Sequence, residues 1–448
     1  MKGFFQKIKD IWSIEELKKK ILFTLGLVLI YRIGSFIIIP GVDSSALDSS
    51  SVNGGGGLGD LLNLFSGGAF SRASIFALGI MPYISASIIM QLMGIAVPAV
   101  QKMQKEGESG RKKLNQYTRF LTIAITLVQA PGYLASSVTS VQGAVPNEGP
   151  FWWFTSVTIL TCCTLFIMWL GEKITDKGIG NGISIIIMIG IIAGFPRAIL
   201  EEWGAGNPFF FLVEIAAFFL IIVASVALVQ AVRRVPVHFA KSNFASGELP
   251  KGEQARSFIP LKVNSSGVMP IIFAQAIMFV PLYMSQSEFF QGSEWIASLS
   301  NFNGISYNLI FALMIIIFTY FYTAITVNVN QISDDMKRNG SFVPGIKPGR
   351  PTAEYLDEIL SRITLPGSVF LALIAVMPAI VAKENLGLTN SQNFAIFFGG
   401  TSLLIMVGVI LDTLQQIESH LLSRHYDGLM QSGTLKGRTG MPVSGITG

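Results

Sequence analysis

The stretch FSGGAFSRASIFALGIMPYIS, residues 65–85, combines two kinds of sequence that seldom occur together. No charged residue occurs from Ala73 to Gln101, which is typical of a membrane span. Within that apolar run stand Gly79 and Pro82, and both residue types disfavour a continuous helix. A simple membrane anchor needs neither residue. The stretch therefore predicts a spanning helix that bends or unwinds at a set position.

The composition of the chain indicates a polytopic membrane protein. Of its 448 residues, 51% are hydrophobic and 13% are charged, and the mean hydropathy is +0.56. Soluble domains carry about 25% charged residues. A large soluble core is disfavoured because soluble helices carry one apolar stripe rather than apolar residues all round. Cys162 and Cys163 are adjacent in an apolar run and are interpreted as packing residues, and the three histidines form no metal-ligand cluster. We expect no cofactor and no metal.

Ten apolar segments are long enough to span a bilayer, and unpaired backbone groups are too costly in lipid for them to be anything but helices. They lie near residues 21–39, 73–100, 118–137, 152–170, 182–200, 209–231, 267–285, 307–329, 365–382 and 395–412. Residues 1–20 are basic and amphipathic, so we interpret them as an interfacial helix rather than a cleavable signal.

The distribution of basic residues predicts the orientation of these spans. With the N-terminus placed in the cytoplasm, 28 of the 32 Lys and Arg residues fall in cytoplasmic segments. The four others are Arg32, Arg72, Arg197 and Lys383. We therefore expect both termini on the cytoplasmic side.

Two cytoplasmic loops, near 232–262 and 330–364, are longer than a minimal transporter needs. Each is either a solvated hairpin or a docking platform for a large partner. The run FVPGIKPGRP, residues 342–351, favours a defined shape because proline and glycine at these spacings set tight turns.

An internal repeat links the two halves of the chain. GIMPYI at residues 79–84 and GVMPII at residues 267–272 both read G-x-M-P-x-I, five spans apart. Five spans place the two copies in opposite orientations, which is the pattern of an inverted repeat, and matching interrupted helices in two such halves indicate the working site. Chance or simple helix-kink chemistry is the alternative. Proline at these positions predicts a bend in each helix, and glycine permits close approach or local unwinding.

The spans are nearly free of the buried acids that a proton- or sodium-coupled carrier uses. Glu214 and Asp412 lie near span ends, and Arg32 is the one midspan charge. Isoleucines recur at one-turn spacing at 80 and 84, and at 183 and 187. They are either ordinary core or lipid-facing residues, or an apolar constriction that excludes ions by dewetting.

A short apolar stretch, Leu58 to Phe65, lies between glycine-rich segments within residues 54–71. It is too short to span a bilayer. It is either a surface loop with one helical turn or a stopper folded back into a funnel, since irregular backbone at membrane depth is allowed only where it lines a cavity.

Several motifs together resemble the SecY family, the channel subunits of the bacterial Sec translocon. They are FSGGAFSRASIFALGIMPYISASIIMQL (65–92), KEGESGRKK (105–113), MWLGEKITDKGIGNGISIII (168–187), PLKVNSSGVMP (260–270), FVPGIKPG (342–349) and FGGTSLLI (398–405). They cover the chain from end to end in the order of the family. The resemblance implies an all-α fold of ten transmembrane helices in two inverted, pseudo-symmetric halves of five.

The resemblance also implies three sets of functional residues. A hydrophobic pore ring comprises Ile80, Ile84, Ile183, Ile187, Ile272 and Ile405. A plug at 58–70 includes Leu58, Leu61, Leu62, Leu64, Phe65 and Phe70, and the glycine run at 54–57 before it departs from the family. A lateral gate between spans 2–3 and 7–8 includes Ser87, Gln129, Gln275, Pro82 and Pro270.

The partners that the resemblance implies are SecE, SecG, the motor ATPase SecA, the translating ribosome, polypeptides that bear signal sequences, and membrane lipid. The docking residues would be Arg233, Arg234, Arg256, Lys347, Arg350 and Arg362, of which Arg233, Arg234 and Arg256 would meet ribosomal RNA phosphates. On sequence alone, Arg362 is also interpreted as an arginine snorkelling at a helix end.

These features favour a passive protein-conducting channel in the bacterial inner membrane. Residues 21–203 and 204–417 would form its two halves, and residues 418–448 a cytoplasmic tail. No G-x-x-x-x-G-K-[ST] fingerprint occurs, so energy would come from a partner or from chain synthesis. The alternative is an inverted-repeat secondary transporter for a small neutral solute. An enzyme is disfavoured because the spans lack a His, Asp and Cys constellation.

Overall fold

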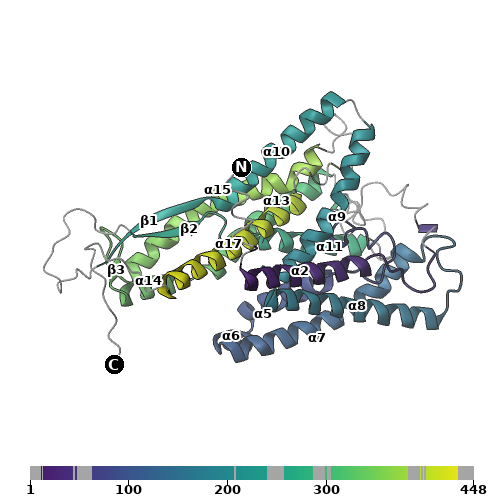
Figure 1. The fold of residues 1–448 in the computed structure, drawn as a ribbon, viewed down its shortest axis with the longest axis horizontal. Helices are drawn as coiled ribbons and strands as arrows, with labels where there is room; N and C mark the ends of the chain where they lie inside the picture. Colours follow the sequence, from purple (N-terminus) through teal and green to yellow (C-terminus); the bar gives the residue numbers. More distant parts are fainter. Residues whose placement is uncertain are drawn as a thin grey trace.

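The computed structural model describes residues 12, 14–43, 46–47, 63–205, 208–239, 257–285, 298–299, 304–381, 394, 397 and 400–431. These residues form long helices and a small sheet at one end (Figure 1). In the part described, seven helices are long and apolar enough to cross a membrane, and one bent pair makes an eighth candidate. The seven contain α7 (Glu108–Tyr133, continued by the π-helical turn η1, Leu134–Val138), α8 (Pro150–Lys177), α9 (Gly182–Ala205), α10 (Pro208–Gln230), α13 (Ile305–Thr326), α15 (Arg350–Val381) and α17 (Gly400–Gln431).

The bent pair and two further helices complete the ten expected spans. The pair is α5 (Met81–Ala96) and α6 (Pro98–Lys105), which are separated by Val97 in an extended conformation. Helix α2 (Glu15–Gly34) begins with a charged turn, and its apolar part is therefore short. Helix α11 (Met269–Ser285) has only 17 residues. Both occupy the expected places in the order of helices, as spans 1 and 7.

The irregularity predicted near Gly79 and Pro82 takes a different form from the expected bend. Residues 67–80 form turns, and α5 begins at Met81, so Pro82 lies in the first helical turn. A proline there loses no hydrogen bond, because the first N–H groups of a helix have no intrahelical partner. Gly79 adopts φ +54° and turns the chain into the helix. The predicted unwinding is therefore correct, and the predicted kink within the helix is wrong.

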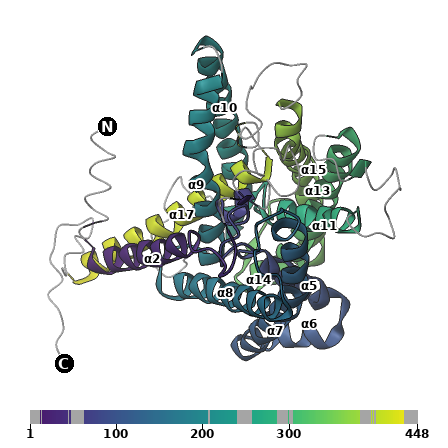
Figure 2. The ribbon, with the colours of Figure 1, turned by 90° about the vertical axis from the view of Figure 1, so that its right-hand side faces the viewer.

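The second copy of the repeat has the same local structure. Gly267 adopts φ +64°, and α11 begins at Met269 with Pro270 as its second residue. Figure 2 shows α6, α7 and α8 in the lower part of the view and α13 and α15 in the upper right. A common core joins the halves, because Ile187 and Ile191 of α9 belong to the same buried cluster as Leu403 and Ile405 of α17.

The two long loops build a compact platform rather than a solvated hairpin alone. Strand β1 (Val232–Phe239) pairs antiparallel with β2 (Ser257–Lys262) and with β3 (Ser341–Phe342). In β1 the buried Val235 and Val237 alternate with exposed residues, which gives the sheet one apolar face. That face packs with Met336 of the amphipathic helix α14 (Val329–Arg338) and with Leu356 of α15 (Figure 1).

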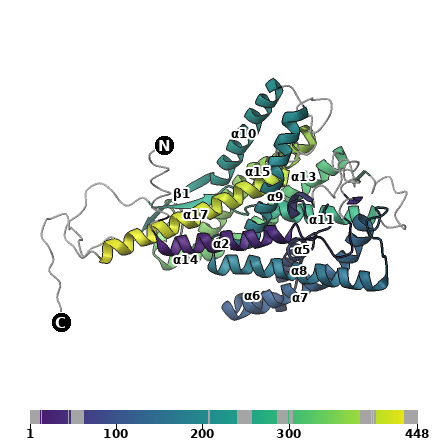
Figure 3. The same cartoon turned by 45° about the vertical axis from the view of Figure 1, so that its right-hand side comes forward.

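Helix α15 runs without interruption from this platform into the apolar part of the molecule. The sequence places the start of span 9 near residue 365, but the helix begins at Arg350. Arg362 therefore lies inside the helix, exposed and paired with Glu358 at 2.5 Å, rather than snorkelling at a helix end. Helix α2 runs beside α17 (Figure 3), and Lys20 Nζ lies 3.4 Å from His420 Nε2 between them.

Candidate functional site: an apolar partition between two cavities

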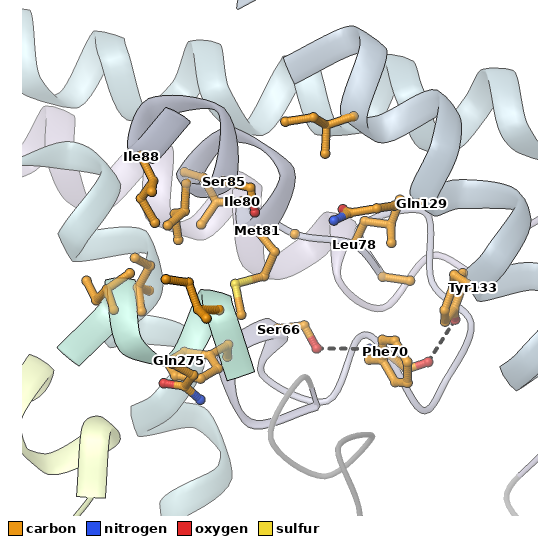
Figure 4. Close-up of a pocket in the computed structure, with 18 of the residues that line it drawn as sticks. Ser66, Phe70, Leu78, Ile80, Met81, Ser85, Ile88, Gln129, Tyr133 and Gln275 are labelled. Atoms are coloured by element: carbon orange, nitrogen blue, oxygen red, sulfur yellow. Dashed lines mark hydrogen bonds between the residues drawn. The ribbon is translucent and has the colours of Figure 1, made fainter. Parts of the chain in front are cut away.

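A cavity of about 420 Å³ lies between the two halves and is lined mainly by apolar side chains (Figure 4). We call it the apolar cavity. Five of the six predicted ring isoleucines line it: Ile80, Ile84, Ile187, Ile272 and Ile405. They come from the start of α5 and from α9, α11 and α17, so both halves contribute. Ile183 does not line the cavity. It lies one turn before Ile187 and packs toward Gly171 of α8.

A second cavity of about 330 Å³ has a more polar lining, with Asn181, Lys262, Asn264 and Asp412 among its residues. We call it the polar cavity. Three isoleucines line both cavities: Ile187, Ile272 and Ile405. They therefore form a partition between the two spaces. Water or an ion that leaves the polar cavity meets stiff, branched side chains that offer no hydrogen bond, which is the arrangement of a gate that works by dewetting.

The predicted plug segment reaches the apolar cavity through two of its aromatic residues. Phe65 and Phe70 line the cavity, and Leu64 lies beside Gly194 of α9. Leu58, Leu61 and Leu62 lie outside the described residues. Residues 63–66 form a single helical turn, followed by turns, but Ser66 and Ala69 are buried. The described part of the segment is therefore an inward-facing loop and not a surface loop.

Two of the predicted gate residues line the apolar cavity, one from each half. Gln129 of α7 and the buried Gln275 of α11 both line it. Ser87 does not line it, because it points to Gln91 within α5 (Nε2 to Oγ, 3.4 Å). Ser85 lines the cavity instead, and no sequence pattern distinguishes it from Ser87. Pro82 and Pro270 are buried in the first turns of α5 and α11, outside the lining.

The comparisons with known proteins identify the family. The model of the SecY family matches residues 74–414. The protein translocase subunit SecY of Streptomyces scabiei is 44% identical over 93% of this chain and 97% of its own length. The chain belongs to the SecY family. The SecY subunits of Haemophilus influenzae and of Escherichia coli K12 are 41% and 40% identical, covering 94% and 97% of this chain and 96% and 98% of their own lengths.

Solved structures show the same SecY fold. One described as a protein conducting channel has a TM-score of 0.63 at 16% identity, covering 92% of this chain and 94% of that one. A canine Sec61 in a ribosome-channel complex has a TM-score of 0.59 at 17% identity, with the same coverage. The ten-helix prediction is therefore correct. As a SecY translocase subunit the chain is a channel protein and not an enzyme, and the secondary-transporter alternative is not supported.

The residues expected to dock partners of this SecY chain lie on or near the platform. Arg233 and Arg234 are exposed on β1, opposite Leu261 and Pro260 of β2. Lys347 is exposed in the turn before α15. Arg350 pairs with Glu354 at 3.1 Å, and Arg362 pairs with Glu358, all on exposed faces of α15. Arg256 lies outside the described residues. The described basic residues thus lie on the sheet, on α15 or in the turn before it.

Proposed function

We propose that this SecY chain conducts unfolded polypeptides across the bacterial inner membrane, with both termini in the cytoplasm. The observation that carries the proposal is the partition of Ile187, Ile272 and Ile405 between the polar and apolar cavities. The polar cavity is then the cytoplasmic mouth, because Lys262 and Asp412 lie at the ends of spans where basic loops begin. A passing chain displaces the isoleucines, which form no specific bonds with it.

At rest, the ring of Ile80, Ile84, Ile187, Ile272 and Ile405 seals the pore, and Ile183 supports it from the second layer of packing. The plug at residues 58–70 closes the far side of the ring. A plug that acts together with the ring is supported by Phe65 and Phe70, which line the same cavity as the isoleucines. Because the isoleucine ring and the plug lie in series, either one still excludes ions when the other moves.

A signal sequence occupies the apolar cavity, between α5 and α11. Gln129 and Gln275 form part of the seam that opens toward lipid. Burial of an apolar signal helix there is favourable, because it removes apolar surface from water at about 25 cal/mol for each Å². Sufficiently apolar segments leave sideways into lipid. Polar segments continue past the ring.

The partners supply energy and support. No nucleotide fingerprint occurs in the chain, so we propose that SecA or the translating ribosome drives the substrate. Both dock on the platform, where Arg233, Arg234, Lys347, Arg350, Arg362 and the undescribed Arg256 present positive charge. SecE and SecG cover apolar helix faces such as that of α10, on which Leu212, Phe219 and Leu220 are exposed.

Site-specific photocrosslinking tests the conduit. A photoreactive amino acid replaces Ile84, which lines the apolar cavity, or Phe154, which is 72% exposed on the outside of α8. A radiolabelled secretory chain is then arrested during translocation. We expect the arrested chain to crosslink to position 84 and not to position 154. Equal crosslinking at both positions, or none at position 84 while the chain is exported, would contradict the proposal.

A further inference from the structure

Two side chains from neighbouring helices hold the backbone of the plug segment, in addition to the local bond from Arg72 Nε to the Gly68 carbonyl at 3.1 Å. The carbonyl of Gly67 accepts a hydrogen bond from Arg32 Nη1 of α2 at 3.3 Å. The carbonyl of Phe70 accepts one from the hydroxyl of Tyr133 of α7 at 2.8 Å. The segment is therefore tied at two points, three residues apart, to helices α2 and α7, which are not consecutive in the chain.

Arg32 lies in the last turn of α2, and neither the pore ring nor the gate uses it. No carboxylate lies within ion-pair distance of it among the described residues. Its charge is instead met by the Gly67 carbonyl and by the ring of Phe36, whose centroid is 5.4 Å from the guanidinium. A charged side chain in an apolar segment is costly, so its presence in the segment near 21–39 indicates a task.

Tyr133, which donates to the Phe70 carbonyl, has a side chain with little conformational freedom. Its side chain is buried, and its ring lies 4.8 Å from that of Phe70 (Figure 4). It stands on α7 one turn after Gln129, and both residues line the apolar cavity. A movement of α7 at the gate therefore moves the group that holds Phe70.

Helix α9 provides a seat for the segment through two glycines spaced four residues apart. A Cβ atom added at Gly190 would collide with the carbonyl oxygen of Phe65, and Gly67 packs on the same glycine. One turn later, a Cβ at Gly194 would lie 3.8 Å from Leu64 Cδ1. Gly67 itself has φ +65°, which suits glycine and aims its carbonyl at Arg32.

We propose that Arg32 and Tyr133 are positioning residues that latch the plug in its closed place against α9. The inference rests on the proposed function, since it assigns to residues 63–70 the role of the plug. Arg32 contributes a charge-assisted bond and Tyr133 a neutral one, so the Arg32 bond is the stronger of the two. Gate opening moves α7, takes the Tyr133 hydroxyl from Phe70 and leaves Arg32 as the second point to release.

A cysteine pair reports the position of the plug. In a background with Cys162→Ser and Cys163→Ser, the substitutions Leu64→Cys and Gly194→Cys place two thiols across the seat. Each latch variant, Arg32→Gln or Tyr133→Phe, is made in this background, and oxidative crosslinking is measured together with resting ion conductance in planar bilayers. Arg197→Gln is the matched control, because Arg197 is also a non-cytoplasmic arginine but pairs with Glu201 on the exposed surface of α9.

We expect the rate of crosslinking to fall and the resting conductance to rise, about tenfold in Arg32→Gln and about threefold in Tyr133→Phe, in line with the greater strength of bonds to charged groups. Arg197→Gln stays at the wild-type values. Tyr133→Phe removes one oxygen atom, so it keeps the test decisive if Arg32→Gln does not fold. Wild-type values in Tyr133→Phe, or the same change in Arg197→Gln as in Arg32→Gln, would overturn the latch. Failure of the wild-type chain to crosslink a secretory substrate at position 84 would instead overturn the conduit.

Discussion

Gly79 and Gly267 hold matching backbone conformations in the two halves of the molecule, at φ +54° and +64°. Each lies two residues before a helix whose second residue is proline. The glycine turns the chain, and the proline then favours the start of the helix. The two helices that flank the apolar cavity, α5 and α11, therefore begin in the same way.

The first prediction concerns these two glycines. Gly79→Ala and Gly267→Ala should each destabilise the protein by roughly 1–2 kcal/mol, the cost of a left-handed conformation for an L-residue. The effect is conformational, because a Cβ at Gly267 meets no atom within 4 Å and one at Gly79 meets only the Phe76 carbonyl oxygen at 3.9 Å. Thermal unfolding in detergent measures it. Gly26→Ala is the control, since Gly26 is helical with open space around it, and equal behaviour of all three variants would contradict the account.

The second prediction separates neighbouring isoleucines of α9. Ile187→Asn, alone or with Ile80→Asn, puts an amide into the partition and gives water a hydrogen-bond partner there. We expect resting ion conductance to rise about tenfold, the effect of lowering a barrier by about 1.4 kcal/mol, and signal-sequence selection to loosen. Ile183→Asn, one turn away and outside both linings, should leak less. Planar bilayers give the comparison, and a leak from Ile183→Asn as large as that from Ile187→Asn would refute the partition.

The third prediction tests Arg362 as a docking residue. Arg362→Glu should impair export of secretory proteins while insertion of the chain into the membrane and its melting temperature stay near wild type. Its exposed pair with Glu358 is worth about 0.3–0.5 kcal/mol at most. Glu358→Gln breaks the same ion pair without reversing the charge of Arg362, so it should export normally. Normal export in Arg362→Glu, or an equal defect in Glu358→Gln, would remove Arg362 from the docking set.

The spans and their order could be predicted because a bilayer requires apolar segments of spanning length. The internal repeat could be predicted because both copies carry the same glycine and proline in the same spacing. The exact positions of individual side chains could not be predicted from the sequence. Ser85 and Ser87 both fit a gate on sequence, and only the rotation of α5 decides between them. Ile183 and Ile187 likewise share a helical stripe, yet Gly171 lets α8 pack closely at Ile183. The sheet was missed because strand β1 carries Pro236, which disfavours a strand, and because its apolar face packs on α14 and α15.

The hydrogen bonds of the plug lay beyond sequence reasoning for a different reason. The carbonyls of Gly67 and Phe70 carry no side-chain signature, so nothing in the sequence marks them as acceptors. Arg32 was visible as an isolated midspan charge, but its partner is a backbone oxygen 35 residues away. Such contacts depend on the turn geometry of residues 67–73 and on the close approach to Gly190.

The most direct test of the central claim is to tie the two halves together across the apolar cavity. Ser85→Cys and Gln275→Cys place one thiol on α5 and one on α11, in the background without Cys162 and Cys163. A reducible bis-methanethiosulfonate then links them in proteoliposomes, and translocation of a secretory protein is measured before and after reduction. The account predicts that the link stops translocation, that reduction restores it, and that a bound signal peptide slows linking. Full translocation through linked channels would contradict it.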